Sequence, residues 1–486
     1  MSLLKLQQAA EFVKINDLVQ AERLYSETIT KHPECGQAYL GMGTIALKIE
    51  QFDKAVYFLT KSCELLPNEA IPLIRLSTAF NGVYSEIDAL TALKYAKKNF
   101  PNDVYVHYHL GLQFIMFGYL DNAKQSFETV IQLTQTSITS FALLELTRVV
   151  INPEQYLTLL ETRLKQKKLV PNEATVLHYA LGNVLDSMQH YDQAWRHFEN
   201  ANLLQAELCE FKTIELQSFF EQIKTIASVN VLSKRRSPDK DTELADTIPI
   251  FIVGLPRTGS TLLEQLLIEH QDIATAGEVP YLSRDVADYL FSHSKSHYPY
   301  SMASATQQQL DVAAQIYLEK ISLHAKGKRY VIDKLPANFQ SIGLIYQLFP
   351  NAKIIHLKRD LPDVAFSIYR NFFAQNEPYL CSLSEFKQYH NFYQDLMEHW
   401  NTQLPGFIHE VSYENLVEDK IQSIKGILEF CELPSRTHGS KLPEANKVIK
   451  TLSNVQVRRP MSTTVINNCY NYAKYLNQFI EDKQVG

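Results

Sequence analysis

A glycine-rich loop between a predicted strand and a predicted helix is the part of this sequence best suited to chemistry. The apolar run Ile250–Val253 predicts a buried parallel strand, and Gly254 and Gly259 let the following loop turn tightly and approach an anion. Ser260 and Thr261 lie where a helix begins, so backbone N–H groups and the positive helix end would face a phosphate. The loop therefore predicts a site for an anionic nucleotide.

The spacing of this loop nearly matches the G-x-x-x-x-G-K-[ST] loop of nucleoside triphosphatases, with one difference. Ser260 stands at the lysine position, so the main contact to a γ-phosphate is missing. Arg257, inside the loop, supplies a planar guanidinium that suits a terminal phosphate or sulfate. Kinase or NTPase activity is therefore disfavoured, and a purely structural glycine turn is the alternative for the loop alone.

A second anion site is predicted at the end of another apolar strand. The run Ala352–Asp360 ends in a basic pair and an acid, and Ser367 follows Arg359 by eight residues on a predicted helix. A guanidinium, a hydroxyl and helix-end amides make a selective site for a monophosphate. An ordinary surface pair of Arg359 and Asp360 is the alternative, but the order of the segments favours a ligand site.

These segments resemble the sulfotransferases that use 3′-phosphoadenosine 5′-phosphosulfate (PAPS). The motif P-R-[ST]-G-[ST]-T stands here as residues 256–261, and the resemblance runs from about residue 248 to about residue 462. Within the superfamily, the chain is most similar to tyrosylprotein sulfotransferases and to bacterial sulfotransferases that carry tetratricopeptide repeats. The resemblance implies that the residues binding PAPS are Arg257, Thr258, Gly259, Ser260, Thr261, Arg359, Ser367, Tyr413, Ser453 and Arg459.

The predicted PAPS-binding residues near the C-terminus match the family less closely than the glycine-rich loop does. Tyr413 belongs to a strand-end "YE" segment, and Ser453 and Arg459 belong to the run SNVQVRRP, which would close over the nucleotide. Arg459 stands where the family often has lysine. Arg370 falls one residue from the place of a further family arginine, so its role stays open.

The resemblance also implies the catalytic groups. A hydroxyl acceptor needs a base, and Glu278 resembles the catalytic glutamate of tyrosylprotein sulfotransferases, although Val279 replaces a second glutamate usual there. Lys334 resembles the lysine that stabilises charge on the leaving group. As rival bases, His270 is interpreted as a helix-end residue and His356 as a core residue. The reaction requires no metal, and no metal-binding motif is found in the sequence.

The N-terminal half is organised as a repeat. Proline and alanine recur every 34 residues, at Pro33, Pro67 and Pro101 and at Ala21, Ala55, Ala89 and Ala123. This period is typical of tetratricopeptide repeats, each a pair of antiparallel helices. Gly43 and Gly111 take the small position of the first helix, and Leu59 and Phe127 the large position of the second. A further unit is predicted at Tyr191–Ala201.

The predicted fold is thus an all-α tetratricopeptide solenoid over residues 1–230, followed by an α/β P-loop-like sulfotransferase domain over residues 248–486 with a mostly parallel sheet. Residues 231–247 are charged and poor in apolar side chains, which is typical of a linker. Between about 138 and 170 the repeat pattern blurs, and a degenerate helical pair is expected there.

Composition indicates the setting in which the chain works. The net charge of -6 and pI near 6.2 argue against nucleic-acid binding. Six scattered cysteines do not suggest a disulfide framework. The N-terminus lacks the long apolar run of a signal peptide or membrane anchor, so no membrane span and a cytoplasmic location are expected.

The expected function is transfer of the sulfuryl group of PAPS to a hydroxyl, with a protein or peptide tyrosine as acceptor. Sulfation of a glycan or small molecule is one alternative, and a non-catalytic nucleotide-binding repeat scaffold is another; retention of both Glu278 and Lys334 favours the enzyme. The acceptor is expected to be recruited through the repeat groove. Homodimer formation is left open.

Overall fold

The computed structural model describes residues 2–166, 168–233, 247–434, 448–451, 454–458 and 467–480. The chain divides into two compact units, Met1–Tyr156 and a second that begins at Leu157. Most of the predicted linker, residues 234–246, lies outside the described residues, so the predicted domain boundaries stay predictions.

The first unit is helical throughout its regular structure, and its consecutive helices pack in pairs. Its elements are α1 (Ser2–Lys14), α2 (Leu18–Lys31), α3 (Gly36–Lys48), α4 (Phe52–Leu65), α5 (Ile71–Gly82), α6 (Glu86–Asn99), α7 (Val104–Phe117), α8 (Leu120–Leu133), α9 (Ile138–Val149) and the 3-10 helix η1 (Pro153–Tyr156).

The repeat pattern in the sequence is explained by the packing within these pairs. A Cβ atom on Gly43 would lie 2.5 Å from Cγ of Leu59, and one on Gly111 would lie 2.5 Å from Cε1 of Phe127. The small residue of the first helix therefore makes room for the large residue of the second. The recurring alanines on α2, α4, α6 and α8 are fully buried, and the recurring prolines follow the ends of α2, α4 and α6. The tetratricopeptide architecture is confirmed.

The second unit begins with more helices. They are α10 (Leu157–Leu164), α11 (Pro171–Ser187), α12 (Tyr191–Ala206), η2 (Thr213–Leu216), α13 (Gln217–Ile226) and α14 (Val229–Leu232). Helices α11 and α12 form the further repeat unit, since a Cβ on Gly182 would lie 2.3 Å from Cε1 of Phe198. The expected helices in the blurred region are present as α9 and α10.

A five-stranded parallel sheet forms the centre of the second unit, in the order β2-β3-β1-β4-β5. Its strands are β1 (Ile248–Gly254), β2 (Ile273–Gly277), β3 (Tyr330–Asp333), β4 (Lys353–Lys358) and β5 (Ile408–Ser412). In β1, Ile250 pairs with Ile332 of β3 and with Lys353 of β4. The C-terminal α/β domain with a parallel sheet is therefore confirmed.

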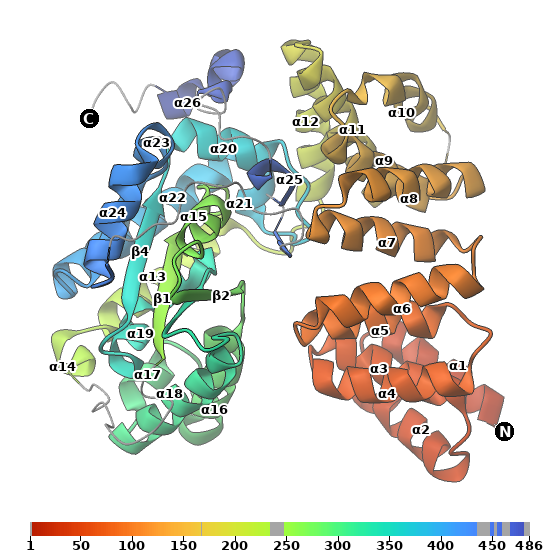
Figure 1. The fold of residues 1–486 in the computed structure, drawn as a ribbon, viewed down its shortest axis with the longest axis horizontal. Helices are drawn as coiled ribbons and strands as arrows, with labels where there is room; N and C mark the ends of the chain where they lie inside the picture. Colours follow the sequence, from red (N-terminus) through yellow and green to blue (C-terminus); the bar gives the residue numbers. More distant parts are fainter. Residues whose placement is uncertain are drawn as a thin grey trace. The chain divides into compact units, whose positions relative to one another are not determined.

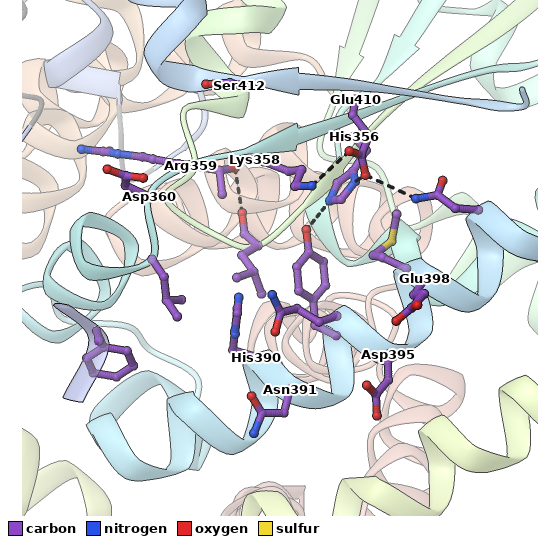
Figure 2. A pocket seen from close by; sticks show the side chains of 18 of the residues that line it. His356, Lys358, Arg359, Asp360, His390, Asn391, Asp395, Glu398, Glu410 and Ser412 are labelled. Atoms are coloured by element: carbon purple, nitrogen blue, oxygen red, sulfur yellow. Dashed lines mark hydrogen bonds and ion pairs between the residues drawn. The ribbon is translucent and has the colours of Figure 1, made fainter. Parts of the chain in front are cut away.

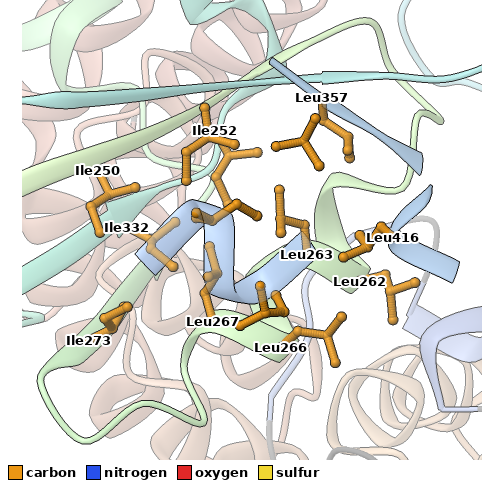
Figure 3. Close-up of a cluster of buried hydrophobic side chains, with 14 of the residues drawn as sticks. Ile250, Ile252, Leu262, Leu263, Leu266, Leu267, Ile273, Ile332, Leu357 and Leu416 are labelled. Atoms are coloured by element: carbon orange, nitrogen blue, oxygen red, sulfur yellow. The ribbon is translucent and has the colours of Figure 1, made fainter. Parts of the chain in front are cut away.

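Both faces of the sheet are covered by helices, which explains why β1 is apolar at successive positions (Figure 1). Ile250 and Ile252 face the helix that follows the glycine-rich loop and pack with its residue Leu263 (Figure 3). Phe251 points to the other face, where its ring lies 5.8 Å from that of Tyr317. Alternate residues of one strand thus hold two hydrophobic layers.

The remaining elements of this unit connect the strands or follow them. They are α15 (Ser260–Leu267), the π-helix η4 (Tyr281–Val286), α16 (Ala287–Ser294), α17 (Tyr300–Ser304), α18 (Gln307–Ser322), η5 (Pro336–Ser341), α19 (Ile342–Leu348), α20 (Leu361–Tyr369), α21 (Pro378–Cys381), α22 (Leu383–Gln403), α23 (Tyr413–Glu418), α24 (Lys420–Phe430), α25 (Asn454–Val457), η7 (Asn468–Tyr475) and α26 (Asn477–Ile480). None of the helices within the described ranges has the length and apolar character needed to cross a membrane.

Candidate active site

The glycine-rich loop lies between β1 and α15, at the carboxyl edge of the sheet. Gly254 has φ +149°, and a Cβ there would lie 2.6 Å from the backbone O of Leu357, so a side chain has no room. Gly259 has φ +97°, and a Cβ there would meet the ring of Tyr413 at 2.4 Å. Arg257 also has a positive φ, +68°, a conformation that non-glycine residues adopt mainly where the surroundings impose it. The loop is thus held in a specific shape.

The hydroxyl residues of the loop have different surroundings. The buried Thr258 donates from its hydroxyl to the backbone O of Leu255 at 2.9 Å, which closes the turn. Ser260 and Thr261 are the first two residues of α15, so their backbone N–H groups lie in the first turn of the helix. The Thr261 hydroxyl is 3.0 Å from that of Thr451. The loop therefore presents the backbone N–H donors of the first turn of α15 close to Arg257 and Arg359.

The two predicted anion sites meet in the structure. Nε of Arg257 donates to Oγ of Ser367 at 3.1 Å, and a terminal nitrogen of Arg359 donates to the backbone O of Arg257 at 3.3 Å. The guanidinium of Arg359 also lies over the ring of Tyr413, 4.5 Å from its centroid. Residues from β1, β4, β5 and their following segments thus gather at one place, which we call the arginine cluster: Arg257, Gly259, Arg359, Ser367 and Tyr413.

Glu278 and Lys334, the predicted catalytic pair, are direct neighbours. Nζ of Lys334 donates to Oε1 of Glu278, and the backbone N of Lys334 donates to the backbone O of Gly277 at 2.9 Å. The two residues follow β2 and β3, which are adjacent strands, so their chain ends lie together at the carboxyl edge. The side chain of Lys334 is 0% exposed, whereas that of Glu278 is 41% exposed. The Glu278 carboxylate is therefore accessible to solvent, and the buried Lys334 ammonium holds it through an ion pair.

Two further acids lie buried near this pair. Glu264, on α15, has an oxygen 4.0 Å from Nζ of Lys334. Asp333, the last residue of β3, accepts hydrogen bonds from Tyr317 at 2.8 Å and Asn338 at 3.1 Å. Burial raises the pKa of Asp333 to about 7, although these hydrogen bonds and Lys334 oppose the shift. The sequence does not predict a role for either acid; the available signal for Glu264 is a charged residue between two pairs of leucines in α15.

The rival bases are engaged elsewhere. His270 is buried just after α15; its Nε2 lies 3.1 Å from the backbone O of Pro434, and its Nδ1 accepts from the backbone N of Asp272 at 3.2 Å. With both ring nitrogens bonded, His270 has no nitrogen ready for an acceptor proton. His356 is buried in β4, as its interpretation as a core residue requires.

A cavity of about 1070 Å³ lies between the ends of β4 and β5 and helix α22 (Figure 2). His356 bonds there to the hydroxyl of Tyr393 and, at 3.2 Å, to Glu410, which also accepts from Lys358 at 3.0 Å. The hydrogen bond from His356, aided by Lys358, lowers the pKa of Glu410 to about 2. These bonds join His356 and Lys358 of β4 to Glu410 of β5, and His356 to Tyr393 of α22. They therefore hold the three elements together.

The late segment of the predicted site is only partly described. Ser453 and Arg459 lie outside the described residues. Between them, Gln456 on α25 accepts from a terminal nitrogen of Arg257 at 2.8 Å, so the segment does reach the arginine cluster. Gln456 and Thr451 were not predicted. Within the described residues, no group of three or more His, Cys, Asp or Glu side chains could hold a metal ion.

Arg370, whose role the sequence left open, joins α20 to the last repeat. It donates to Asp186 of α11 at 2.7 Å, and its guanidinium lies 5.2 Å from the ring centroid of Phe366. Asp186 also accepts from the hydroxyl of Tyr472. Because α20 carries Ser367, this ion pair anchors the helix of the arginine cluster.

Helix α12 contacts the same end of α20. The ring of Trp195 stacks on Tyr369 at 5.0 Å and on Tyr475 at 4.5 Å, and the amide of Asn202 donates to the backbone O of Tyr369 at 2.7 Å. The last repeat unit therefore packs as part of the core of the second unit and stabilises α20.

A truncation series tests this packing. We expect residues 157–486 to bind 3′-phosphoadenosine 5′-phosphate with an affinity close to that of the full chain, because the second unit is compact by itself. Residues 247–486 lack Trp195 and Asp186, so the end of α20 loses its support. Binding should weaken about tenfold or more, which needs a loss of only ~1.4 kcal/mol. Calorimetry on both fragments measures this; equal affinities would show that α11 and α12 do not support the site.

Comparison with known proteins supplies independent information. Residues 249–437 match the model of the Sulfotransferase family. An uncharacterized protein of Aquifex aeolicus is 30% identical over 412 residues, which cover 82% of this chain and 53% of that protein. Protein-tyrosine sulfotransferase 1 of Mus musculus is 36% identical over 114 residues, which cover 23% of this chain and 31% of that protein. The chain thus spans about half the length of the first relative and about a third of the second.

Among solved structures, a thermophilic TPR protein of Thermus thermophilus is similar, with 20% identity and a TM-score of 0.30, covering 40% of this chain and 99% of that chain. The repeat architecture itself rests on the helix pairs described above. The family match contains the glycine-rich loop, Glu278, Lys334, Arg359 and Ser367. Residues 249–437 therefore form a domain similar to the Sulfotransferase family, and tetratricopeptide repeats precede this domain in the chain.

Proposed function

We propose that this chain transfers the sulfuryl group of PAPS to an acceptor hydroxyl, and that the acceptor is a tyrosine of a protein or peptide. The observation that carries the proposal is the contact between Glu278 and Lys334 at the same sheet edge as the arginine cluster. A base, a cation for the leaving group and donors for two phosphates are the groups that this reaction needs.

The residues of the site support binding of the two phosphate groups of a 3′-phosphorylated nucleotide. Arg257 and the first turn of α15 would hold the 5′-phosphosulfate, and Arg359 with Ser367 would hold the 3′-phosphate. The crowded positions of Gly254 and Gly259 keep the loop backbone free of side chains, so that it can approach an anion. Ser453 and Arg459 are proposed to complete the site on the resemblance alone.

When bound, PAPS supplies an activated sulfuryl group and a bisphosphate leaving group. Glu278, being half-exposed, can accept the proton of the incoming hydroxyl. Lys334 places its positive charge beside Glu278 and neutralises the negative charge that develops on the bisphosphate leaving group. The reaction requires no metal in this scheme.

The acceptor assignment rests on similarity to protein-tyrosine sulfotransferases and on the repeats as an extended surface for a protein or peptide. Incubation of the full chain with sulfur-labelled PAPS and a cell lysate, followed by hydrolysis and identification of the labelled compound, tests it. We expect label on tyrosine. Label on a sugar or a small alcohol would replace the acceptor, and bisphosphate binding without any labelled product would favour a non-catalytic scaffold.

A further inference from the structure

Lys334 lies between two carboxylates, only one of which has a role in the proposed reaction. Nζ of Lys334 contacts Glu278 on one side and lies 4.0 Å from Oε2 of Glu264 on the other. The side chain of Glu264 is 6% exposed and that of Lys334 is 0% exposed. An ammonium so fully removed from water needs a negative partner at every stage of a reaction.

Glu264 is held in place by the turn that carries Glu278. The hydroxyl of Thr275, on β2, donates to Oε1 of Glu264 at 2.5 Å, and the backbone N of Gly277 donates to the same hydroxyl at 2.9 Å. The carboxylate is therefore tied through Thr275 to the chain that leads directly to Glu278. Its second oxygen, Oε2, is the one that lies toward Lys334.

The reaction itself removes one of the two negative charges. As the acceptor oxygen bonds to sulfur, its proton passes to Glu278, and the bond between sulfur and the bridging oxygen breaks with its electron pair going to the bisphosphate. Glu278 is then neutral and no longer balances Lys334. Glu264 touches neither substrate in this scheme, so in its ionised form it keeps its charge through this step.

We propose that Glu264 is a positioning residue that holds the Lys334 ammonium while Glu278 is protonated. This inference rests on the proposed function. With Glu264 present, protonation of Glu278 leaves Lys334 paired and in place for the leaving group. Without its charge, the same protonation would remove the second carboxylate that contacts Lys334. Among the described residues, only the buried Asp333, whose pKa burial raises to about 7, would remain nearby, so proton transfer to Glu278 would be opposed.

The charges that face Glu264 agree with this role and predict a pH dependence. The pKa of Glu264 is raised, chiefly by burial and in small part by the negative charge of Glu278. Lys334 and the hydrogen bond from Thr275 oppose this rise but do not cancel it. The ionised form of Glu264, which is the form able to hold Lys334, is thus gained only as pH rises through this raised value. Turnover should therefore rise over the same range in the wild type, and this part of the pH profile should vanish in Glu264→Gln.

Kinetics provide the first measurement. Glu264→Gln keeps the shape of the side chain but removes its charge. We expect kcat at saturating PAPS to fall about 10- to 100-fold, because the Lys334 ammonium is no longer held in its position. KM for PAPS and the affinity for 3′-phosphoadenosine 5′-phosphate should stay within about threefold. Gln265→Leu, at a buried position next to Glu264 on the same helix, is the matched control and should retain the wild-type kcat and pH profile.

A second measurement does not depend on activity. In a double-mutant cycle by thermal unfolding at pH 8, Lys334→Met should lower Tm less in the Glu264→Gln background than in the wild type, by about 3 °C or more. Because the pKa of Glu264 is raised by burial, the difference should shrink as pH falls and Glu264 is protonated. This cycle separates the two proposals: if the wild type transferred no sulfuryl group, the proposed function would fail, while the cycle would still show whether Glu264 partners Lys334.

Two results would overturn the inference. One is wild-type kcat and an unchanged pH profile in Glu264→Gln; the other is additive Tm losses in the cycle at pH 8. If Glu264→Gln loses activity and nucleotide binding together, while the cycle is additive, Glu264 is a packing residue only.

Discussion

Glu278→Gln is expected to lower turnover by about 10²- to 10⁴-fold while the affinity for 3′-phosphoadenosine 5′-phosphate is retained. The amide keeps the size of the carboxylate and can still bond near Lys334, but it cannot take the proton of an acceptor hydroxyl. The side chain is 41% exposed, so the substitution should not disturb the core. The measurement is kcat at saturating PAPS, with calorimetry on the bisphosphate as the control for the intact site.

Lys334→Ala provides the comparison that separates a base from a charge stabiliser. It should also lower turnover, because charge on the leaving group would lack its cation. A more acidic phenol needs less help from a base, so it should partly rescue Glu278→Gln and leave Lys334→Ala impaired. Wild-type turnover in Glu278→Gln, with the chemical step rate-limiting, would show that Glu278 is not the base. His270 could not then replace it in this conformation, because both its ring nitrogens are bonded.

Arg359→Ala is expected to weaken binding of 3′-phosphoadenosine 5′-phosphate by about 2–4 kcal/mol, since it removes a charge-assisted contact from a largely desolvated place. The side chain of Arg359 is 9% exposed and lies over Tyr413. Binding of ATP, which lacks a 3′-phosphate, should be much weaker in the wild type and should change little. Calorimetry with both nucleotides measures the difference.

Lys358→Ala is the matched control for that substitution. Lys358 precedes Arg359, but its side chain is 55% exposed and pairs with Glu410, away from the arginine cluster. Its removal should change bisphosphate affinity by less than about threefold, as for a screened surface charge. Equal affinities of the wild type for ATP and the bisphosphate would argue against a dedicated 3′-phosphate site.

Features that depend on local sequence could be predicted for this chain. The 34-residue period reflects the fully buried alanines at Ala21, Ala55, Ala89 and Ala123, and the contacts of Gly43 with Leu59 and of Gly111 with Phe127 lie two periods apart. The glycine-rich loop could be placed because a buried strand, two glycines and a helix start are consecutive in sequence. That Glu278 and Lys334 touch follows once β2 and β3 are neighbours.

Features that depend on contacts between distant segments could not be predicted. Nothing in the sequence near Trp195 indicates that its ring stacks on Tyr369, more than 170 residues later, or that Asp186 pairs with Arg370. Glu264 is similar: a glutamate on a helix is usually solvated, and only the positions of Thr275 and Lys334 make it a buried partner. These are tertiary contacts, for which a single sequence carries no periodic signal.

The most direct measurement is the simultaneous release of 3′-phosphoadenosine 5′-phosphate and formation of sulfated product by the full chain, with PAPS and a tyrosine peptide as substrates. Sulfuryl transfer requires the two products in equal amounts, and we predict equal initial rates that fall together in Glu278→Gln. Tight binding of the bisphosphate with no sulfated product from any hydroxyl acceptor would contradict the assignment as an enzyme.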